Sequence, residues 1–141
     1  MEGMLLFVYG TLRSCNDNDV RRDLSKKSSY IGEAYYRGKL YLVDSYPALI
    51  PSDDPSDKVI GEVYRLHNSE TIEKIDKYEE CGELFPKPYE FIRVQDVVTM
   101  IDSRASVECF VYLYNRKVEG LTRIKSGDFC KDRMYRDGVL S

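Results

Sequence analysis

The chain has 141 residues, a formal net charge of −3 and a sequence pI near 5.3. This length suits one compact domain with its own core, so we expect a single domain over residues 1–141. The acidic balance and the lack of a basic stripe argue against nucleic acid as a partner. No apolar run approaches the length of a membrane span and no basic region opens the chain, so we expect a cytoplasmic protein with no membrane partner.

The cysteine pattern indicates neither a zinc site nor a disulfide framework. Four cysteines are widely spaced without a Cys-x-x-Cys pair: Cys15, Cys81, Cys109 and Cys130. We therefore expect reduced thiols, with Cys109 buried inside a strand. The acidic segments at 16–19 and 53–57 lack the glycine and glutamate positions of a calcium loop, and we predict no metal site and no cofactor.

Histidine occurs once, at His67. It precedes Asn68-Ser69-Glu70, which is typical of a helix start, so we expect a surface position for it. Because histidine is the commonest general base, an enzyme with this composition must rely on a carboxylate, a tyrosine or a thiol. The twelve tyrosines include candidates for the lining of a polar cavity.

The first half of the chain predicts strands around one short helix. A buried strand is expected over 4–9, and its apolar run breaks at Gly10, where turning backbone can present N–H groups to a ligand. A polar helix is expected over 17–27. A long strand follows over 30–43, where Gly32 and Gly38 indicate the bends of a coiled sheet.

The central part predicts two strands, over 46–50 and 59–66, separated by a polar loop over 51–58. A short helix is expected over 71–79, because Ile72, Ile75 and Tyr78 recur at spacings of three. Glu79 lies at the edge of that apolar side.

The last part predicts a proline-containing loop over 81–88 and a hairpin of strands over 90–101 and 107–114, followed by turns over 120–129. The fold class expected is therefore α+β, with a small mixed, mainly antiparallel β-barrel and a few short helices packed against it. A Rossmann arrangement is disfavoured, because Gly10 begins Gly-x-x-Arg and not Gly-x-Gly-x-x-Gly.

Six tracts, in this order, resemble the γ-glutamylcyclotransferase-like family, which includes the γ-glutamylamine cyclotransferases and AIG2-like proteins. They are Val8-Tyr9-Gly10-Thr11-Leu12, Tyr46-Pro47-Ala48-Leu49, Gly61-Glu62-Val63-Tyr64, Ile75-Asp76-Lys77-Tyr78-Glu79, Cys109-Phe110-Val111-Tyr112 and Ser126-Gly127-Asp128-Phe129. The last departs from a family Ser-Gly-Asp-Trp tract by having Phe129 in place of tryptophan.

The resemblance implies a small mixed barrel with a pocket between the glycine turn and Glu79. It also implies a cofactor-independent enzyme of acyltransferase or lyase type, which releases 5-oxoproline and a free amine or peptide from a γ-glutamyl compound. Glu79 is the implied general acid and base. The implied substrate-binding residues are Tyr9, Gly10, Thr11, Leu12 and Tyr112, with Tyr46 as a further contact.

This chemistry suits the residues available. The substrate's own α-amine attacks its γ-carbonyl, so the protein must orient the glutamyl chain, move one proton and supply donors for an oxyanion. The N–H groups of Gly10, Thr11 and Leu12 are candidate donors, either for that oxyanion or for the α-carboxylate. Glu80 is the rival base, but successive helical residues differ by about 100° in direction and the family tract selects Glu79.

Two readings therefore stay open. One is the enzyme, and the alternative is a non-catalytic small-molecule-binding or regulatory module that keeps the pocket, since a fold alone does not prove function. The sequence does not identify which γ-glutamyl compound is the substrate, and it leaves the oligomeric state open.

Overall fold

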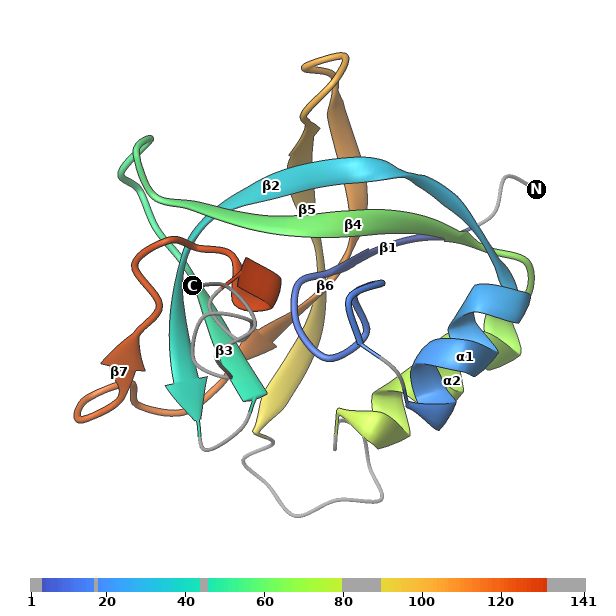
Figure 1. Cartoon of the computed structure of the whole chain (residues 1–141), viewed down its shortest axis with the longest axis horizontal. Helices are drawn as coiled ribbons and strands as arrows, with labels where there is room; N and C mark the ends of the chain where they lie inside the picture. Colours follow the sequence, from blue (N-terminus) through green and yellow to red (C-terminus); the bar gives the residue numbers. More distant parts are fainter. Residues whose placement is uncertain (1–3, 17, 44–45, 80–89, 132–141) are drawn as a thin grey trace.

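The structure, a computed structural model, describes residues 4–16, 18–43, 46–79 and 90–131 (Figure 1). Seven strands and two longer helices occur within these ranges, and residues 129–131 are also helical. In chain order they are β1 (Met4–Val8), α1 (Asp19–Lys26), β2 (Ser28–Val43), β3 (Tyr46–Pro51), β4 (Lys58–Leu66), α2 (Ser69–Tyr78), β5 (Phe91–Met100), β6 (Ser106–Tyr114) and β7 (Thr122–Arg123).

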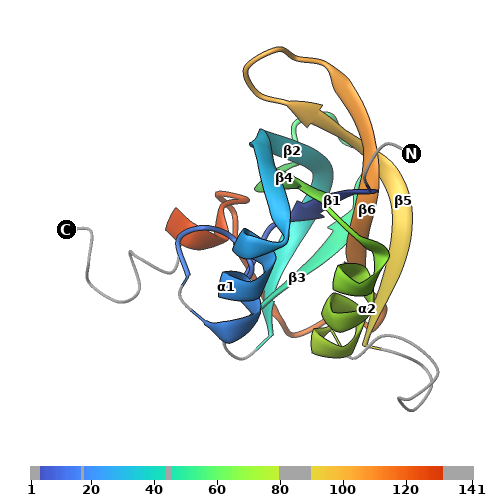
Figure 2. The same ribbon diagram turned by 90° about the vertical axis from the view of Figure 1, so that its right-hand side faces the viewer.

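Five strands close into a barrel. They follow the order β2-β4-β1-β6-β5, and β5 pairs again with β2 to complete the ring. The β1–β6 pairing is parallel, whereas the other pairings are antiparallel. The expected fold class, a small mixed and mainly antiparallel barrel with a few short helices, is confirmed. Figure 2 shows β1 and β6 side by side and the two helices on one side of the barrel.

The long strand β2 belongs to two sheets. Its first part pairs with β4 and its last part pairs with β3 and β7, so β3 and β7 extend the sheet beyond the barrel. The register with β4 shifts between Tyr30 and Gly32, and Gly32 has a φ of 155°. The bend predicted at Gly32 is confirmed, and it allows β2 to curve across the molecule.

The apolar run of β1 is explained by two cores on its opposite faces. Phe7 and Tyr9 belong to the cluster inside the barrel, whereas Leu6 and Val8 belong to a second cluster beneath the helices. Successive strand residues point to opposite faces, and here both faces are buried. The first strand therefore runs between two apolar layers and reaches the site from the centre of the molecule.

The two helices pack against the outer face of the barrel, and each contributes only a few buried side chains. Leu24 is the buried residue of α1, and Ile72 and Ile75 are buried on α2. Each helix begins at an asparagine, Asn18 or Asn68, whose side chain accepts a hydrogen bond from a first-turn N–H. None of the described helices is long and apolar enough to cross a membrane.

The expectation of reduced thiols is wrong for two cysteines. Cys15 and Cys130 form a disulfide with a Cα–Cα distance of 6.0 Å across a sequence separation of 115 residues. The spacing of the cysteines in the sequence does not predict this pair, because only the folded structure brings the turn after β1 next to the segment after β7. Cys109 is free and buried, as predicted, and Cys81 lies outside the described residues.

We expect reduction of this disulfide to lower the free energy of unfolding by about 2 to 4 kcal/mol, because the crosslink constrains a long loop of the unfolded chain. Urea denaturation with and without dithiothreitol measures the difference. Cys15→Ser/Cys130→Ser should show the lower stability under both conditions. Equal stability of the oxidised and reduced wild-type protein would contradict the prediction.

Candidate active site

A cavity of about 280 Å³ opens between the end of β1, the end of α2 and the beginnings of β3 and β5. Most of the tracts singled out in the sequence contribute to its wall. Its lining consists of Phe7, Val8, Tyr9, Gly10, Thr11, Leu12, Tyr46, Pro47, Tyr78, Glu79, Glu90, Phe91 and Tyr112.

Two carbonyl groups of the turn after β1, those of Gly10 and Thr11, accept hydrogen bonds from within the protein. Arg13 N donates to Gly10 O at 3.0 Å, which closes a four-residue turn. The Asn16 amide donates to Gly10 O at 2.8 Å, and the Asn18 amide donates to Thr11 O at 3.0 Å. The N–H groups of Thr11 and Leu12, in the middle of the turn, donate to no residue that the structure describes. The turn therefore has two N–H groups that can donate to a ligand.

Gly10 is required by a close approach of β3. A Cβ atom at this position would lie 2.5 Å from Pro47 Cγ, a distance that real Cβ contacts essentially never show. Pro47 follows Tyr46 at the start of β3, so the Tyr-Pro tract and the glycine turn form one continuous wall. This contact explains why the strand breaks at a glycine.

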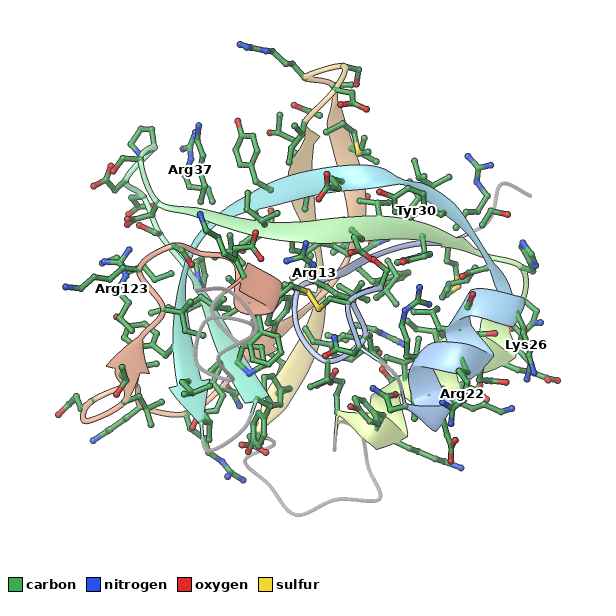
Figure 3. The ribbon with its side chains drawn as sticks, in the orientation of Figure 1. Arg13, Arg22, Lys26, Tyr30, Arg37 and Arg123 are labelled. Atoms are coloured by element: carbon green, nitrogen blue, oxygen red, sulfur yellow. A yellow bond between two sulfur atoms is a disulfide. The ribbon has the colours of Figure 1, made fainter. Side chains whose placement is uncertain are left out.

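A buried arginine holds the turn from behind. Arg13 is 5% exposed, and its guanidinium contacts Asp128 at 2.8 Å and Glu62 at 3.4 Å. Ser14 N also donates to Glu62 at 2.9 Å. Figure 3 shows Arg13 in the interior, near the disulfide. Sequence reasoning included Glu62 and Asp128 in family tracts but did not identify this cluster, because its members are far apart in the chain.

Glu62 is the most completely satisfied carboxylate of the cluster. Burial alone would raise the pKa of Glu62, but hydrogen bonds from Tyr64 and Ser14, together with the Arg13 charge, outweigh burial and lower that pKa. Glu62 is therefore ionised and serves as a structural anchor for the turn.

Glu79 ends α2 and faces the pocket. Its N–H donates to Ile75 O at 2.9 Å, which places it at the helix C-cap, and its side chain stays partly accessible through the cavity. Tyr78 is 37% exposed, and its hydroxyl hydrogen bonds to the Thr11 hydroxyl at 2.6 Å. The two tracts that the sequence singled out therefore meet directly beside the cavity.

The electrostatic surroundings of Glu79 favour its protonated form. Desolvation by burial, followed by the nearby carboxylates Glu90 and Asp76, raises the pKa of Glu79 to about 8. Within the described parts of the chain, no cation pairs with the Glu79 carboxylate. A carboxyl group with a pKa near neutrality can both accept and return a proton.

Asp76 lies one helical turn before Glu79 and has strong partners of its own. Arg93 Nη1 donates to Asp76 Oδ2 at 2.8 Å, and the Tyr112 hydroxyl donates to Asp76 Oδ1 at 2.5 Å. Burial and this hydrogen bond raise the pKa of Tyr112. Tyr112 lines the pocket as its predicted role requires, but its hydroxyl is committed to Asp76. Its side chain therefore forms part of the cavity wall.

Tyr9 is also placed in the wall, with its hydroxyl turned inward. It donates to the Tyr112 carbonyl at 2.6 Å in the buried interior. Desolvation by burial, followed by the charge of Glu79, raises the pKa of Tyr9. Tyr9 therefore couples β1 to β6 and contributes its ring, not its hydroxyl, to the cavity.

Sequence reasoning missed Glu90, which joins the cavity immediately before β5. Its side chain is 9% exposed, and the Tyr46 hydroxyl donates to its Oε2. The sequence predicted residue 90 as the start of a strand, and no pattern there distinguishes a pocket carboxylate from a surface one. The rival base Glu80 lies outside the described residues. Among those that are described, no cluster of three metal-ligating side chains occurs.

The small mixed barrel therefore has a cavity lined by the glycine turn and by the carboxylates Glu79 and Glu90. Comparison with known proteins identifies the family to which such a chain belongs. Residues 6–131 match the model of the family described as "Gamma-glutamyl cyclotransferase, AIG2-like". The chain belongs to this family.

Individual relatives agree with this assignment. The chain is 32% identical over 133 residues to the γ-glutamylcyclotransferase family protein ytfP of Citrobacter rodentium, a match that covers 94% of this chain and all of that protein. It is 26% identical over 117 residues to γ-glutamylaminecyclotransferase of Bos taurus, covering 76% of this chain and 63% of that one.

Solved structures show the same fold. YkqA of Bacillus subtilis superposes with a TM-score of 0.72 at 26% identity, over 98% of this chain and 43% of the longer YkqA chain. The AIG2-like protein of Mus musculus superposes with a TM-score of 0.68 at 23% identity, over 89% of this chain and 88% of that one. The likeness to the mouse protein is one of fold.

We expect Glu79→Gln to stabilise the protein increasingly as the pH rises from 5 to 8. The pKa of Glu79 is about 8 in the folded state, against about 4.3 for an unperturbed glutamate, so between these values the unfolded chain loses the proton that the folded protein retains, and the stability of the wild-type protein falls as the pH rises. The advantage of the variant should grow by roughly 3 to 4 kcal/mol between pH 5 and pH 8, at about 1.4 kcal/mol for each pH unit.

Urea denaturation at several pH values measures this gain. Glu73→Gln, on an exposed part of the same helix, is the matched control and should leave the pH dependence unchanged. Parallel stability curves for wild-type protein and Glu79→Gln between pH 5 and 8 would disprove the prediction.

Proposed function

We propose that the protein is a γ-glutamyl cyclotransferase that acts as one domain over residues 1–141 without a cofactor. It converts a γ-glutamyl compound into 5-oxoproline and a free amine or peptide. The observation that supports this most strongly is the pairing of Glu79, a pocket glutamate without a described cation, with a turn whose central N–H groups have no acceptor among the described residues. Family membership supports the same class of reaction.

Ring closure begins with folding of the substrate. The α-amine must reach the γ-carbonyl of the same glutamyl group, and good intramolecular alignment contributes roughly 7 to 11 kcal/mol to such a reaction. A compact cavity with the rings of Tyr9 and Tyr112 in its wall restricts a flexible glutamyl chain to bent conformations. The buried hydrogen bond between these two residues keeps that wall rigid.

Glu79 then moves the proton. It accepts a proton from the α-ammonium group, which leaves the amine nucleophilic, and the amine nitrogen attacks the γ-carbonyl carbon. As the carbon–nitrogen bond to the leaving group breaks, Glu79 returns the proton to the departing nitrogen. The ring nitrogen, which the attack left positively charged, loses its second proton to give the neutral lactam, and the released amine takes up a proton from solution at neutral pH. A pKa near 8 serves both steps at neutral pH, because the carboxyl group is then neither a very weak base nor a very weak acid.

The turn after β1 supplies the donors. The N–H groups of Thr11 and Leu12 suit a substrate oxygen that carries negative charge, whether the oxyanion of the attacked carbonyl or the α-carboxylate. Pro47 and Arg13 hold this turn from two sides, so the donors are fixed before the substrate arrives. Preorganised donors lose little free energy to reorientation during the reaction.

We expect purified protein to release 5-oxoproline from at least one member of a panel of γ-glutamyl amines, γ-glutamyl dipeptides and glutathione. Glu79→Gln should lower kcat by about 10²- to 10⁴-fold, because the amide cannot accept the α-ammonium proton. Chromatographic detection of 5-oxoproline measures the rate, and circular dichroism checks the fold.

The control is Glu73→Gln, which carries the same chemical change on an exposed position of α2 and should keep the wild-type rate. A folded Glu79→Gln protein with undiminished turnover would remove Glu79 from the mechanism. Binding of panel compounds without any product would favour a non-catalytic module.

A further inference from the structure

The disulfide between Cys15 and Cys130 lies outside both apolar cores. Cys15 is in the loop between β1 and α1, and Cys130 is in the short helical stretch 129–131 that follows β7. Neither cysteine belongs to one of the two apolar clusters of the barrel and the helices. Very small domains need disulfides to compensate for a small core, but a domain of 141 residues does not. The position of the crosslink, beside the candidate site, therefore calls for a separate explanation.

The loop that carries Cys15 also carries the donors of the turn. The side chain of Asn16, the next residue, donates to Gly10 O at 2.8 Å and to Arg13 O at 3.1 Å. Along the backbone, Asn16 N donates to Arg13 O and Arg13 N donates to Gly10 O, each at 3.0 Å. These hydrogen bonds lead from the residue beside the disulfide to the glycine that begins the turn. A shift of the loop at Cys15 would therefore be transmitted to the central N–H groups of the turn.

The segment that carries Cys130 is held firmly against the barrel. Phe129 is fully buried in the cluster inside the barrel, and Gly127 O accepts a hydrogen bond from Ile60 N on β4 at 2.7 Å. The disulfide thus attaches the loop to a segment that the barrel keeps in place.

The contacts that would remain after cleavage of the disulfide are not covalent. The ion pair of Arg13 with Asp128 joins the same two segments, but the Asp128 side chain is 25% exposed, and solvent weakens such pairs. The contacts of Arg13 and Ser14 with Glu62 lie at the near end of the loop, before Cys15. Cleavage would therefore allow the loop more conformations without unfolding the barrel.

We propose that the Cys15–Cys130 disulfide is a redox switch of the candidate site. In the oxidised protein it holds the turn after β1 in the conformation that positions its donors, and reduction by a dithiol releases the turn and lowers activity. The effect on activity rests on the proposed cyclotransferase function, whereas the release of the turn does not.

The reduction is an ordinary thiol–disulfide exchange. Cys15 is half-buried and Cys130 is 7% exposed, so the sulfur of Cys15 is the more open point of attack. A thiolate of the dithiol attacks Cys15 Sγ, the sulfur–sulfur bond breaks, and Cys130 leaves as a thiolate that takes up a proton. The second thiolate of the dithiol displaces Cys15, which takes up a proton in turn. The products are two protein thiols and the cyclic disulfide of the reductant.

Amide hydrogen exchange, followed by NMR in oxidised protein and in protein reduced with dithiothreitol, measures the release of the turn. The amides of Arg13 and Asn16 are hydrogen bonded within the turn and should exchange about tenfold or more faster after reduction. The amide of Glu79, hydrogen bonded to Ile75 O at the end of α2, is the internal reference and should change by less than about twofold. Unchanged exchange in the turn, or an equal acceleration at Glu79, would overturn the proposal.

Turnover is measured with a γ-glutamyl compound that has no thiol, so that the substrate itself does not react with the disulfide. Reduction should lower kcat/KM by about 10- to 100-fold, because a displacement of about 1 Å in a reacting geometry can cost 10²-fold. Reoxidation with oxidised glutathione, removed before the assay, should restore the rate.

Cys15→Ser/Cys130→Ser is the matched control. It should have the low rate of the reduced wild-type protein, and dithiothreitol should not lower that rate further. A response to dithiothreitol that persists in this variant would assign the effect to another cysteine and overturn the switch. Circular dichroism checks that the reduced protein and the variant are folded, and general unfolding of the reduced wild-type protein would also contradict a local switch.

The two measurements keep the switch distinguishable from the proposed function. Selective release of the turn, with no turnover of any panel compound in either redox state, would support the switch and count against the cyclotransferase alone. Equal turnover by the oxidised and the reduced protein would overturn the switch and leave the cyclotransferase standing.

Discussion

The buried contacts of Arg13 hold together the parts of the molecule on which the site depends. Arg13 links the turn after β1 to Glu62 on β4 and to Asp128 near the C-terminal end of the described chain. The disulfide between Cys15 and Cys130 joins the same two segments two residues further along. Removing one partner of a buried ion pair typically costs 3 to 5 kcal/mol, so this anchor is a stringent constraint on the fold. It fixes the turn, whose central N–H groups have no acceptor among the described residues.

The buried carboxylates of the molecule fall into two groups, those that stabilise the fold and those that line the cavity. Carboxylates that hold the fold, Glu62 and Asp76, are supplied with arginines and hydroxyl donors. Carboxylates that face the cavity, Glu79 and Glu90, are left without cations from the described protein, and the pKa of Glu79 rises accordingly. Unpaired buried charge destabilises a fold, and such strain is typical of sites where a ligand supplies the missing partner.

Much of the fold followed from local patterns in the sequence. The apolar run before Gly10, the helix ending near Tyr78 and the hairpin of β5 and β6 have periodicities or turn residues that predict them. The sequence predicted a barrel but not that β2 and β5 would close it, because no local pattern identifies which distant strands pair. The family tracts identified Glu79 and the glycine turn, and the structure places them in one cavity. The cation-free carboxylate Glu90 and the disulfide arise from long-range contacts, which no spacing in the chain reveals.

The proposed mechanism depends above all on the protonation of Glu79 in the folded protein. A pH titration of the Glu79 side-chain carboxyl carbon by ¹³C NMR, assigned by loss of its resonance in Glu79→Gln, measures that property directly. The account predicts a midpoint near pH 8, because burial and the neighbouring carboxylates oppose ionisation. A midpoint near 4.3, the value of an unperturbed glutamate, would show a solvated surface carboxylate and contradict the assignment of Glu79 as the proton shuttle.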